Sequence, residues 1–502
     1  MIPIFIVALI LRFLYFPNNI YFGIDQANGS FAVKEILSGE PKLIGPSTTF
    51  NGLRHGVLYY YLYTPFYLLG NGDPSFAAAF LRVVNASGVF LIFLISMILF
   101  NKYVGFISAF LFAVSFEQTQ FAIYFNHPSL AVISILLMYL GLAILVFQKK
   151  YWGFILALLG LGLSIQFEFI LTYLVVPFVL ILLTFRESLL KIPFKILIWG
   201  LAAFLLSIST YIIAEIKFSF RGVNSLLGLL GNGDKSLYKI ISTYIFEMGQ
   251  VIKFNIIAVN ELKYFGQLLL LGALIWNLKS KYTKEIIFLG IWFFSAIIVY
   301  FVGGGEDLNV DIIQYHPNVG ISLSLMIFVA YLLYMIGKKT HFIITLIILI
   351  LISIGNFSQI QIINPYGSMP EINAQSFMLL SDQKKVLDYI YESSDGKLFA
   401  LKGITLPFYV NTTWSYLFEW YGMQRYGYLP IWGGKNALGY SGNLQVEDAQ
   451  DKLPDDRYLI IEPTRGIPQH LINNYLKEEN YFTNIVEEKK IGSFIVQKRI
   501  RK

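Results

Sequence analysis

Long apolar runs separated by short polar stretches fill the first 357 residues of the chain. A helix that crosses a bilayer needs about 20 predominantly apolar residues, and about eleven runs approach that length. They lie near residues 1–16, 76–100, 104–123, 128–147, 151–166, 168–185, 194–214, 264–278, 285–303, 317–337 and 341–357. The pattern predicts an α-helical polytopic membrane domain over residues 1–357. Its long loops are expected at 17–75, 215–263 and 304–316.

The pattern changes at about residue 358. Short strand-like runs and amphipathic helical stretches replace the long apolar runs, which is typical of a mixed α/β fold. The strand-like runs lie at 397–404, 457–463 and 491–499, and the amphipathic stretches at 381–394 and 468–479. We therefore predict a small α/β domain over residues 358–502. The aromatic stretch at 411–434 is expected to pack against the membrane domain rather than to bind an acceptor.

The composition agrees with membrane insertion and excludes several kinds of active site that depend on cysteine. Hydrophobic residues make up 56% of the chain and charged residues only 14%, against about 25% charged in a soluble domain. The chain contains no cysteine, which excludes disulfides, thiolate nucleophiles and zinc bound by cysteine. The first apolar run lacks a basic segment before it and is expected to be a retained helix, not a signal peptide.

Basic residues concentrate in alternate short loops, which carry 11 Lys and Arg against two acidic residues, Glu187 and Glu285. The positive-inside rule places these loops and the N-terminus in the cytoplasm. An odd number of spans then places the C-terminal domain outside. Residues 358–502 contain 16 basic and 16 acidic residues, so the net charge of +7 comes from the membrane half. It reflects topology and does not indicate a nucleic-acid partner.

A carboxylate, Asp25, follows the first apolar run by only a few residues. Further along the same loop, Arg54 and His55 precede a segment with five tyrosines in nine residues: Tyr59, Tyr60, Tyr61, Tyr63 and Tyr67. Tyrosine-rich amphipathic segments favour the bilayer interface. The loop is therefore either a pair of interfacial anchoring helices or a catalytic loop beside the lipid, with a carboxylate at one end and two cations at the other.

The stretches "YFGIDQANGSFAVKEILSGE" and "GVLYYYLYTPFYLLGNGDPSFAAAFLRVVNA" resemble the GT-C glycosyltransferases of the protein O-mannosyltransferase and aminoarabinose (lipid A) transferase type. The resemblance covers about residues 1–340 and is strongest from 8 to 90. It implies an integral membrane enzyme that takes a sugar from a polyprenyl-phosphate donor at the outer face.

The resemblance also implies residue roles. Asp25 matches the catalytic carboxylate of the first outer loop, but Gln26 stands where mannosyltransferases often have Glu. Arg54 and His55 match charged residues that precede a proline turn in relatives, although this chain lacks the prolines. Arg82 matches a basic residue of the second span. These residue types also suit sugar transfer apart from the resemblance. A carboxylate can accept the acceptor's proton, and cations can hold the departing lipid phosphate.

Other polar residues are expected at the outer ends of the spans. Glu168, in a tight turn between two spans, is the second candidate carboxylate, since ionisable groups buried in a membrane are usually functional. Further candidates are Asn126, His127 and His316, with Lys217 and Arg221 as phosphate ligands. Glu306, Asp307 and Asp311 could bind a divalent metal, or could form a solvated acidic loop.

These observations predict a GT-C-type membrane glycosyltransferase of the cell envelope. Its partners would be a polyprenyl-phosphate sugar, the bilayer and a protein, lipid or glycan acceptor, with no nucleic acid. A transporter or flippase of lipid-linked sugars is the first alternative, although charges near the midplane and related halves are not evident. An envelope assembly protein is the second alternative, although it would not need carboxylates and cations together at the ends of several spans.

Overall fold

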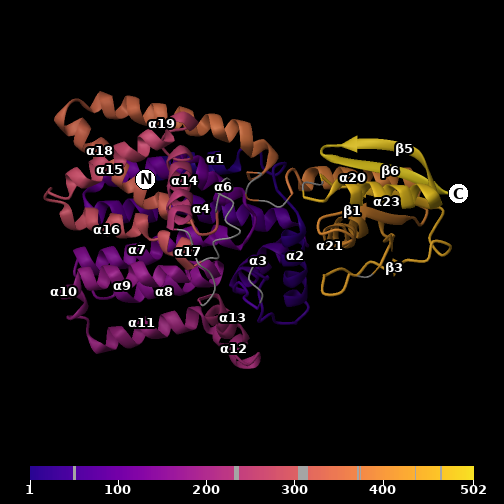
Figure 1. Cartoon of the computed structure of the whole chain (residues 1–502), viewed down its shortest axis with the longest axis horizontal. Coiled ribbons are helices and arrows are strands. Elements are labelled where there is room, and N and C mark those ends of the chain that lie inside the picture. The colour runs from indigo at the N-terminus through magenta and orange to yellow at the C-terminus, as the bar shows by residue number, and fades with distance from the viewer. Residues whose placement is uncertain are drawn as a thin grey trace.

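The computed structural model describes residues 1–48, 52–230, 237–302, 315–369, 372, 375–435, 437–463 and 466–502, without the side chains of residues 188, 189 and 226–230. The chain folds into a helical membrane half and a C-terminal half that contains a β-sheet. Figure 1 shows the two halves at opposite ends of the long axis.

The membrane half is almost entirely helical. Its elements are α1 (Ile2–Phe13), α2 (Ile24–Leu37), α3 (Leu58–Leu69), α4 (Pro74–Leu99), α5 (Lys102–Val114), α6 (Phe116–Ile123), η1 (His127–Leu130), α7 (Ala131–Phe147), α8 (Gly153–Phe167), η2 (Phe169–Leu174), α9 (Val175–Thr184), α10 (Arg186–Leu189), α11 (Phe194–Ser207), α12 (Ser209–Lys217), α13 (Arg221–Leu230), α14 (Leu237–Lys253), η3 (Asn260–Leu262), α15 (Lys263–Asn277), α16 (Thr283–Phe294), α17 (Ile297–Val302), α18 (Ile321–Lys339), α19 (Phe342–Ile363) and η4 (Asn364–Tyr366).

In the part of the chain that the structure describes, five helical segments are long and apolar enough to cross a membrane. Two bent pairs raise this number to seven: α5 with α6, bent by 56°, and α11 with α12, bent by 59°. Each predicted apolar run coincides with a helix or with two consecutive helices. The prediction of a multi-pass helical membrane protein is therefore confirmed, while the count of eleven spans stays a prediction because α1, α8, α15 and η2 with α9 are shorter.

A buried arginine fixes the break between α5 and α6. Arg12 of α1 is fully buried, and its guanidinium donates to the carbonyls of Phe112 and Ala113 at 3.2 and 3.0 Å. These carbonyls lie in the last turn of α5, where the helix leaves acceptors without intrahelical partners. The Arg12 Nε also donates to the Asn85 Oδ1 of α4 at 2.7 Å. One side chain thus joins α1, α4 and the bend of the third apolar segment.

The C-terminal half carries a six-stranded sheet of order β3-β2-β1-β4-β6-β5. The first four strands in this order are parallel, and β6 and β5 are antiparallel additions. The elements are α20 (Leu380–Ser394), β1 (Ala400–Ile404), α21 (Thr412–Leu417), η5 (Phe418–Gly422), α22 (Met423–Tyr426), β2 (Ile431–Gly433), β3 (Val446–Glu447), β4 (Asp456–Ile461), α23 (Gln469–Phe482), β5 (Thr483–Ile491) and β6 (Phe494–Arg501).

The predicted strand-like runs overlap β1, β4 and β6, and the two amphipathic stretches overlap α20 and α23. Helix α19 continues through residue 358 to Ile363, so the helical membrane half extends six residues past the predicted end at 357. The division of the chain into two domains stays a prediction.

The two halves are joined next to Asp25. The Phe22 amide donates to the Met378 carbonyl at 2.7 Å, and the Leu380 amide donates to the Ile20 carbonyl at 2.9 Å. Tyr416 of α21 packs its ring against Phe22 and Phe31 at centroid distances of 5.7 and 5.3 Å. In Figure 1, α2 and α3 lie on the side of the membrane half that faces the sheet. The aromatic stretch therefore packs against the membrane half, as the sequence indicates.

Candidate functional site

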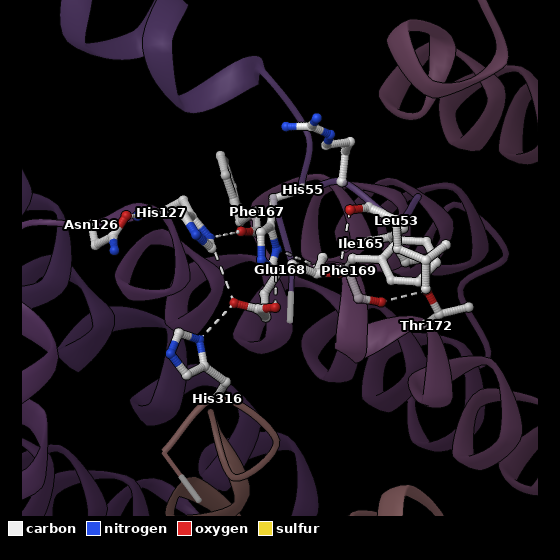
Figure 2. Close-up of polar contacts among 12 residues, drawn as sticks. Leu53, His55, Asn126, His127, Ile165, Phe167, Glu168, Phe169, Thr172 and His316 are labelled. Carbon is white, nitrogen blue, oxygen red and sulfur yellow. Dashed lines mark hydrogen bonds and ion pairs between the residues drawn. The ribbon is translucent and has the colours of Figure 1, made fainter. Parts of the chain in front are cut away.

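Three segments that are distant in sequence approach the carboxylate of Glu168. His55 Nδ1 lies 3.1 Å from Oε1, and the Nδ1 atoms of His127 and His316 lie 3.5 and 2.8 Å from Oε2. The side chain of Glu168 is only 2% exposed. Figure 2 shows the three imidazoles around this carboxylate. We call Glu168, His55, His127 and His316 the histidine cluster.

Local structure explains the position of Glu168 in the histidine cluster. Helix α8 ends there, because Glu168 adopts an extended conformation with φ −147° and ψ 110°. Its amide still donates to the Ser164 carbonyl at 2.9 Å, while η2 begins at the next residue. The break turns the carboxylate away from the helix axis and toward the three histidines (Figure 2).

Each histidine is held by its own segment. His127 begins η1, where the Asn126 Oδ1 accepts from the His127 amide at 2.8 Å, and His127 Nδ1 lies 2.7 Å from the Phe167 carbonyl oxygen. His55 lies between α3 and the backbone bridge that pairs Ser47 with Arg54, and its ring centroid is 4.1 Å from that of His127.

His316 lies in the loop before α18. Tyr173 holds this loop by donating to the Pro317 carbonyl at 3.0 Å, and Trp292 donates to the Gly320 carbonyl at 3.1 Å. The His316 side chain is 39% exposed. The surrounding protein lowers the pKa of His316, but the Glu168 carboxylate outweighs this effect, so the pKa lies above its usual range. His316 is thus the accessible member of the histidine cluster.

Asp25 stands beside the histidine cluster in the first turn of α2. The turn is fixed by Gln26, whose Oε1 accepts from the Gly23 amide at 3.1 Å and whose Nε2 donates to the Phe125 carbonyl at 2.9 Å. An acidic residue in this turn is stabilised by the helix dipole. The Asp25 side chain is exposed. The surrounding protein nevertheless raises the pKa of Asp25, and the charges of His316 and His55 act in the opposite direction.

His55 and His316 therefore act on two carboxylates: they form ion pairs with Glu168, and their charges favour the ionised form of Asp25. The tyrosine-rich helix α3 adds a further link. Burial raises the pKa of Tyr60 to about 12, and its hydroxyl also interacts with the charges of Asp25 and Arg54. Tyr59 is buried, with its ring 4.1 Å from Tyr60 and 5.4 Å from His127.

Three other polar residues predicted to belong to the site form hydrogen bonds with neighbouring segments of the chain. Gln26 holds the start of α2, as described above. Asn126 caps η1 and donates through Nδ2 to the Tyr124 hydroxyl at 3.1 Å. Arg82 is fully buried in α4, donates to the Asn19 Oδ1 at 2.9 Å and lies 4.6 Å from the centre of the Phe16 ring. These contacts hold Gln26, Asn126 and Arg82 in the fold, and a part for them in the site stays a prediction.

The candidate phosphate ligands are exposed side chains. Arg54 is exposed and donates to the Ser47 Oγ at 2.6 Å. Lys217 and Arg221 are exposed at the end of α12 and the start of α13. Neither forms an ion pair with the histidine cluster among the described residues. Glu306, Asp307 and Asp311, the predicted metal ligands, lie outside the described residues.

Sequence reasoning named all four members of the histidine cluster but not their convergence. His55 was expected at the donor phosphate, whereas in the structure it faces Glu168. One signal was available, because the chain has only five histidines and three of them follow or precede apolar runs. One ligand atom each of His55, His127 and Glu168 lies within 4.8 Å of the others, so this group could hold a metal ion.

Comparison with known proteins agrees with this architecture. A family model described as dolichyl-phosphate-mannose-protein mannosyltransferase matches residues 54–213. The matched segment contains His55, His127 and Glu168 but not Asp25. No curated protein matches the chain at a significant level of sequence similarity.

Solved structures are similar over the whole chain. The structure of ArnT from Cupriavidus metallidurans bound to undecaprenyl phosphate has a TM-score of 0.63 at 9% identity, and covers 99% of this chain and 97% of that one. The apo structure of ArnT from the same organism has a TM-score of 0.62 at 10% identity, with the same coverage of both chains. An Archaeoglobus fulgidus oligosaccharyltransferase has a TM-score of 0.46 at 12% identity, over 86% of this chain and 63% of that one. The predicted resemblance to the GT-C glycosyltransferases is confirmed.

Proposed function

We propose that this chain, a multi-pass membrane protein with the fold of the GT-C glycosyltransferases, transfers a sugar from a polyprenyl-phosphate-linked donor to an acceptor at the outer membrane face. The observation that carries the proposal is the buried carboxylate of Glu168 with three histidines at the ends of helices, together with the exposed carboxylate of Asp25, on which the charges of His55 and His316 act. The undecaprenyl phosphate of the similar ArnT structure supports a lipid-phosphate donor here. A transporter would need ionisable groups along a path through the membrane, not a cluster at helix ends.

Asp25 is the proposed general base. In the reaction an acceptor hydroxyl or amine attacks the anomeric carbon of the donor sugar, and the bond between that carbon and the phosphate oxygen breaks. The acceptor proton passes to the Asp25 carboxylate, and the lipid phosphate leaves with the bonding electrons. The exposed position of Asp25 gives the acceptor access, and its raised pKa makes the carboxylate a better proton acceptor.

Cationic groups would stabilise the departing phosphate. Arg54 is the first candidate, because its charge and that of Asp25 both interact with the Tyr60 hydroxyl. Lys217 and Arg221 are further candidates on the neighbouring α12 and α13. Among the described residues the Arg54 guanidinium donates to the Ser47 Oγ, and it could turn other N–H groups to a phosphate.

An apolar cavity in the membrane half suits the isoprenoid part of such a donor. It has a volume of about 180 Å³ and lies between α14, α15, α16 and α18. Leu270, Leu274, Leu289, Phe293 and Phe328 are among its lining residues. Tyr244 in the cavity lining lies with its ring 5.9 Å from that of Tyr300, whose hydroxyl donates to the Asn318 Oδ1 at 3.4 Å.

The proposal can be tested with the purified chain. Mass spectrometry of lipid extracted from the protein in mild detergent should detect a polyprenyl phosphate or a polyprenyl-phosphate sugar at a near-stoichiometric amount. The same preparation should consume a matching synthetic polyprenyl-phosphate sugar only when a cell-envelope extract supplies the acceptor. Absence of bound polyprenyl lipid together with absence of turnover over a panel of such donors would contradict the proposal.

We also propose that residues 358–502 form a separate domain on the outer side of the membrane. The excess of basic residues in the alternate short loops and the neutral charge of the C-terminal region support this orientation. Protease added to sealed, right-side-out vesicles should release a fragment of this region, recognised by an antibody to the C-terminus. Cleavage only in inverted vesicles would show that this region lies on the cytoplasmic side and would contradict the proposal.

A further inference from the structure

We propose that Glu462 in the C-terminal half is a positioning residue for Asp25, acting through two segments of this half that contact helix α2 and the residues before it. The inference deepens the proposed function and rests on it, because Asp25 is the proposed base. Glu462 directly follows β4, and its amide donates to the Ile404 carbonyl of β1 at 3.1 Å. Since β1 and β4 are the central strands, Glu462 is anchored in the middle of the sheet.

The Glu462 carboxylate accepts hydrogen bonds from three different segments. Its Oε2 atom accepts from the Gln375 Nε2 at 2.6 Å and from the Leu406 amide at 3.0 Å. Its Oε1 atom accepts from the indole N–H of Trp414 at 2.9 Å. The side chain is 3% exposed and forms no ion pair with any described residue. An ionised carboxylate, which only accepts hydrogen bonds, matches these three N–H donors.

Gln375 connects Glu462 to the first of the two segments, which ends in the first turns of α20. Residues 378–380 of this segment pair their backbone with residues 20–22. The segment also holds Phe22 through its side chains, because the Gln383 Nε2 donates to the Phe22 carbonyl at 2.8 Å. Phe22 immediately precedes the N-cap residue of α2. A shift of this segment would therefore move the start of the helix that carries Asp25.

Trp414 connects Glu462 to the second segment, helix α21. Tyr416 of the same helix packs its ring against Phe22 and against Phe31 of α2. Figure 1 shows α21 beside α2. The Trp414 side chain is fully buried, so its hydrogen bond to Glu462 holds α21 in the orientation that presents Tyr416 to α2.

One buried carboxylate thus joins the sheet to two contacts with the first outer loop. The charges of Glu462 and Asp25 also both act on the hydroxyl of Tyr21 in this loop. Catalysis is sensitive to the position of a base, since a displacement of about 1 Å can cost roughly a hundredfold in rate. Glu462→Gln replaces one acceptor oxygen with a donor that faces the N–H groups of its neighbours. It should therefore loosen α2 without leaving a cavity.

Hydrogen exchange of the full chain in detergent tests the inference without any substrate. We expect the amides of α2 to exchange about tenfold faster in Glu462→Gln than in the wild type, while α7 keeps the wild-type rate. Trp414→Phe, which removes the indole N–H and keeps an aromatic ring, should change α2 in the same direction. Glu478→Gln, at an exposed carboxylate of α23, is the matched control. Wild-type exchange of α2 in both variants, or equally faster exchange of α7, would overturn the inference.

Transfer kinetics supply the second measurement. The rate at saturating donor should fall about tenfold in Glu462→Gln with the KM for the donor unchanged, because the base acts in the transition state. In an Asp25→Asn background the same change should cause no further loss, since the base that Glu462 positions is already absent. Equal losses in the two backgrounds would overturn the inference. Wild-type transfer by Asp25→Asn alone would contradict the proposed base, whereas wild-type exchange of α2 in Glu462→Gln and Trp414→Phe would contradict only the positioning role of Glu462.

Discussion

Replacing Asp25 with asparagine should reduce the rate of sugar transfer by about a hundredfold or more, the usual scale for losing a general base. The change keeps the shape of the side chain and removes the carboxylate that would accept the acceptor's proton. Asp25 is exposed and forms no ion pair with the described residues, so folding should be unaffected. Donor binding should also be preserved, because the base acts only in the transition state.

The measurement is the initial rate of transfer from a polyprenyl-phosphate sugar at saturating donor, with bound lipid quantified in parallel. Glu40→Gln is the matched control, because Glu40 is an exposed carboxylate of the same outer segment and has no role in the site. The raised pKa of Asp25 adds a second signature. Activity of the wild type should decline on acidification at a pH above the ordinary aspartate range, as the carboxylate becomes protonated. Wild-type rates in Asp25→Asn would make Asp25 an ordinary loop residue.

Replacing Arg12 with methionine should lower the free energy of unfolding by about 2–4 kcal/mol. The change leaves two buried carbonyls at the end of α5 and the Asn85 side-chain oxygen without their donor. Each unsatisfied acceptor costs about 1–3 kcal/mol, partly offset because a charged group is no longer buried. The guanidinium also stands at a helix C-terminus, where a positive charge is favourable.

Thermal unfolding in detergent, followed by intrinsic fluorescence, should show a melting temperature several degrees lower for Arg12→Met. Arg186→Met serves as the control, because Arg186 is exposed at the start of the short helix α10. An unchanged melting temperature would mean that water or a rearranged α5–α6 bend satisfies the carbonyls in place of Arg12.

The membrane half could be predicted from sequence because the bilayer imposes a simple rule, that backbone groups in lipid must be satisfied within a helix. The apolar runs therefore coincide with helices, and Asp25 could be placed just outside the first of them. The breaks within the bent helix pairs could not be predicted from the sequence. The bend between α5 and α6, for example, depends on Arg12, which is distant in sequence. Strand β5 was missed because nearly all of its side chains are exposed and show no alternation.

The candidate site was only partly predictable for a related reason. Asp25 and Glu168 could each be identified from their position at the end of an apolar run. Their approach to His55 and His316 depends on how α2, α8 and the loop before α18 pack, and local periodicity contains no information about that packing. The assignment of Lys217 and Arg221 as phosphate ligands stays a prediction, because a charge in a suitable loop does not by itself indicate where the side chain points.

The backbone pairing of residues 20–22 with 378–380 has a consequence for how relatives of this chain can diverge. Amide and carbonyl groups make this connection, with Phe22 and Leu380 as donors. Such a connection survives the exchange of side chains but not the introduction of proline at either donor. The two halves of the molecule can therefore diverge far in sequence while the position of residues 20–22 relative to the sheet is kept.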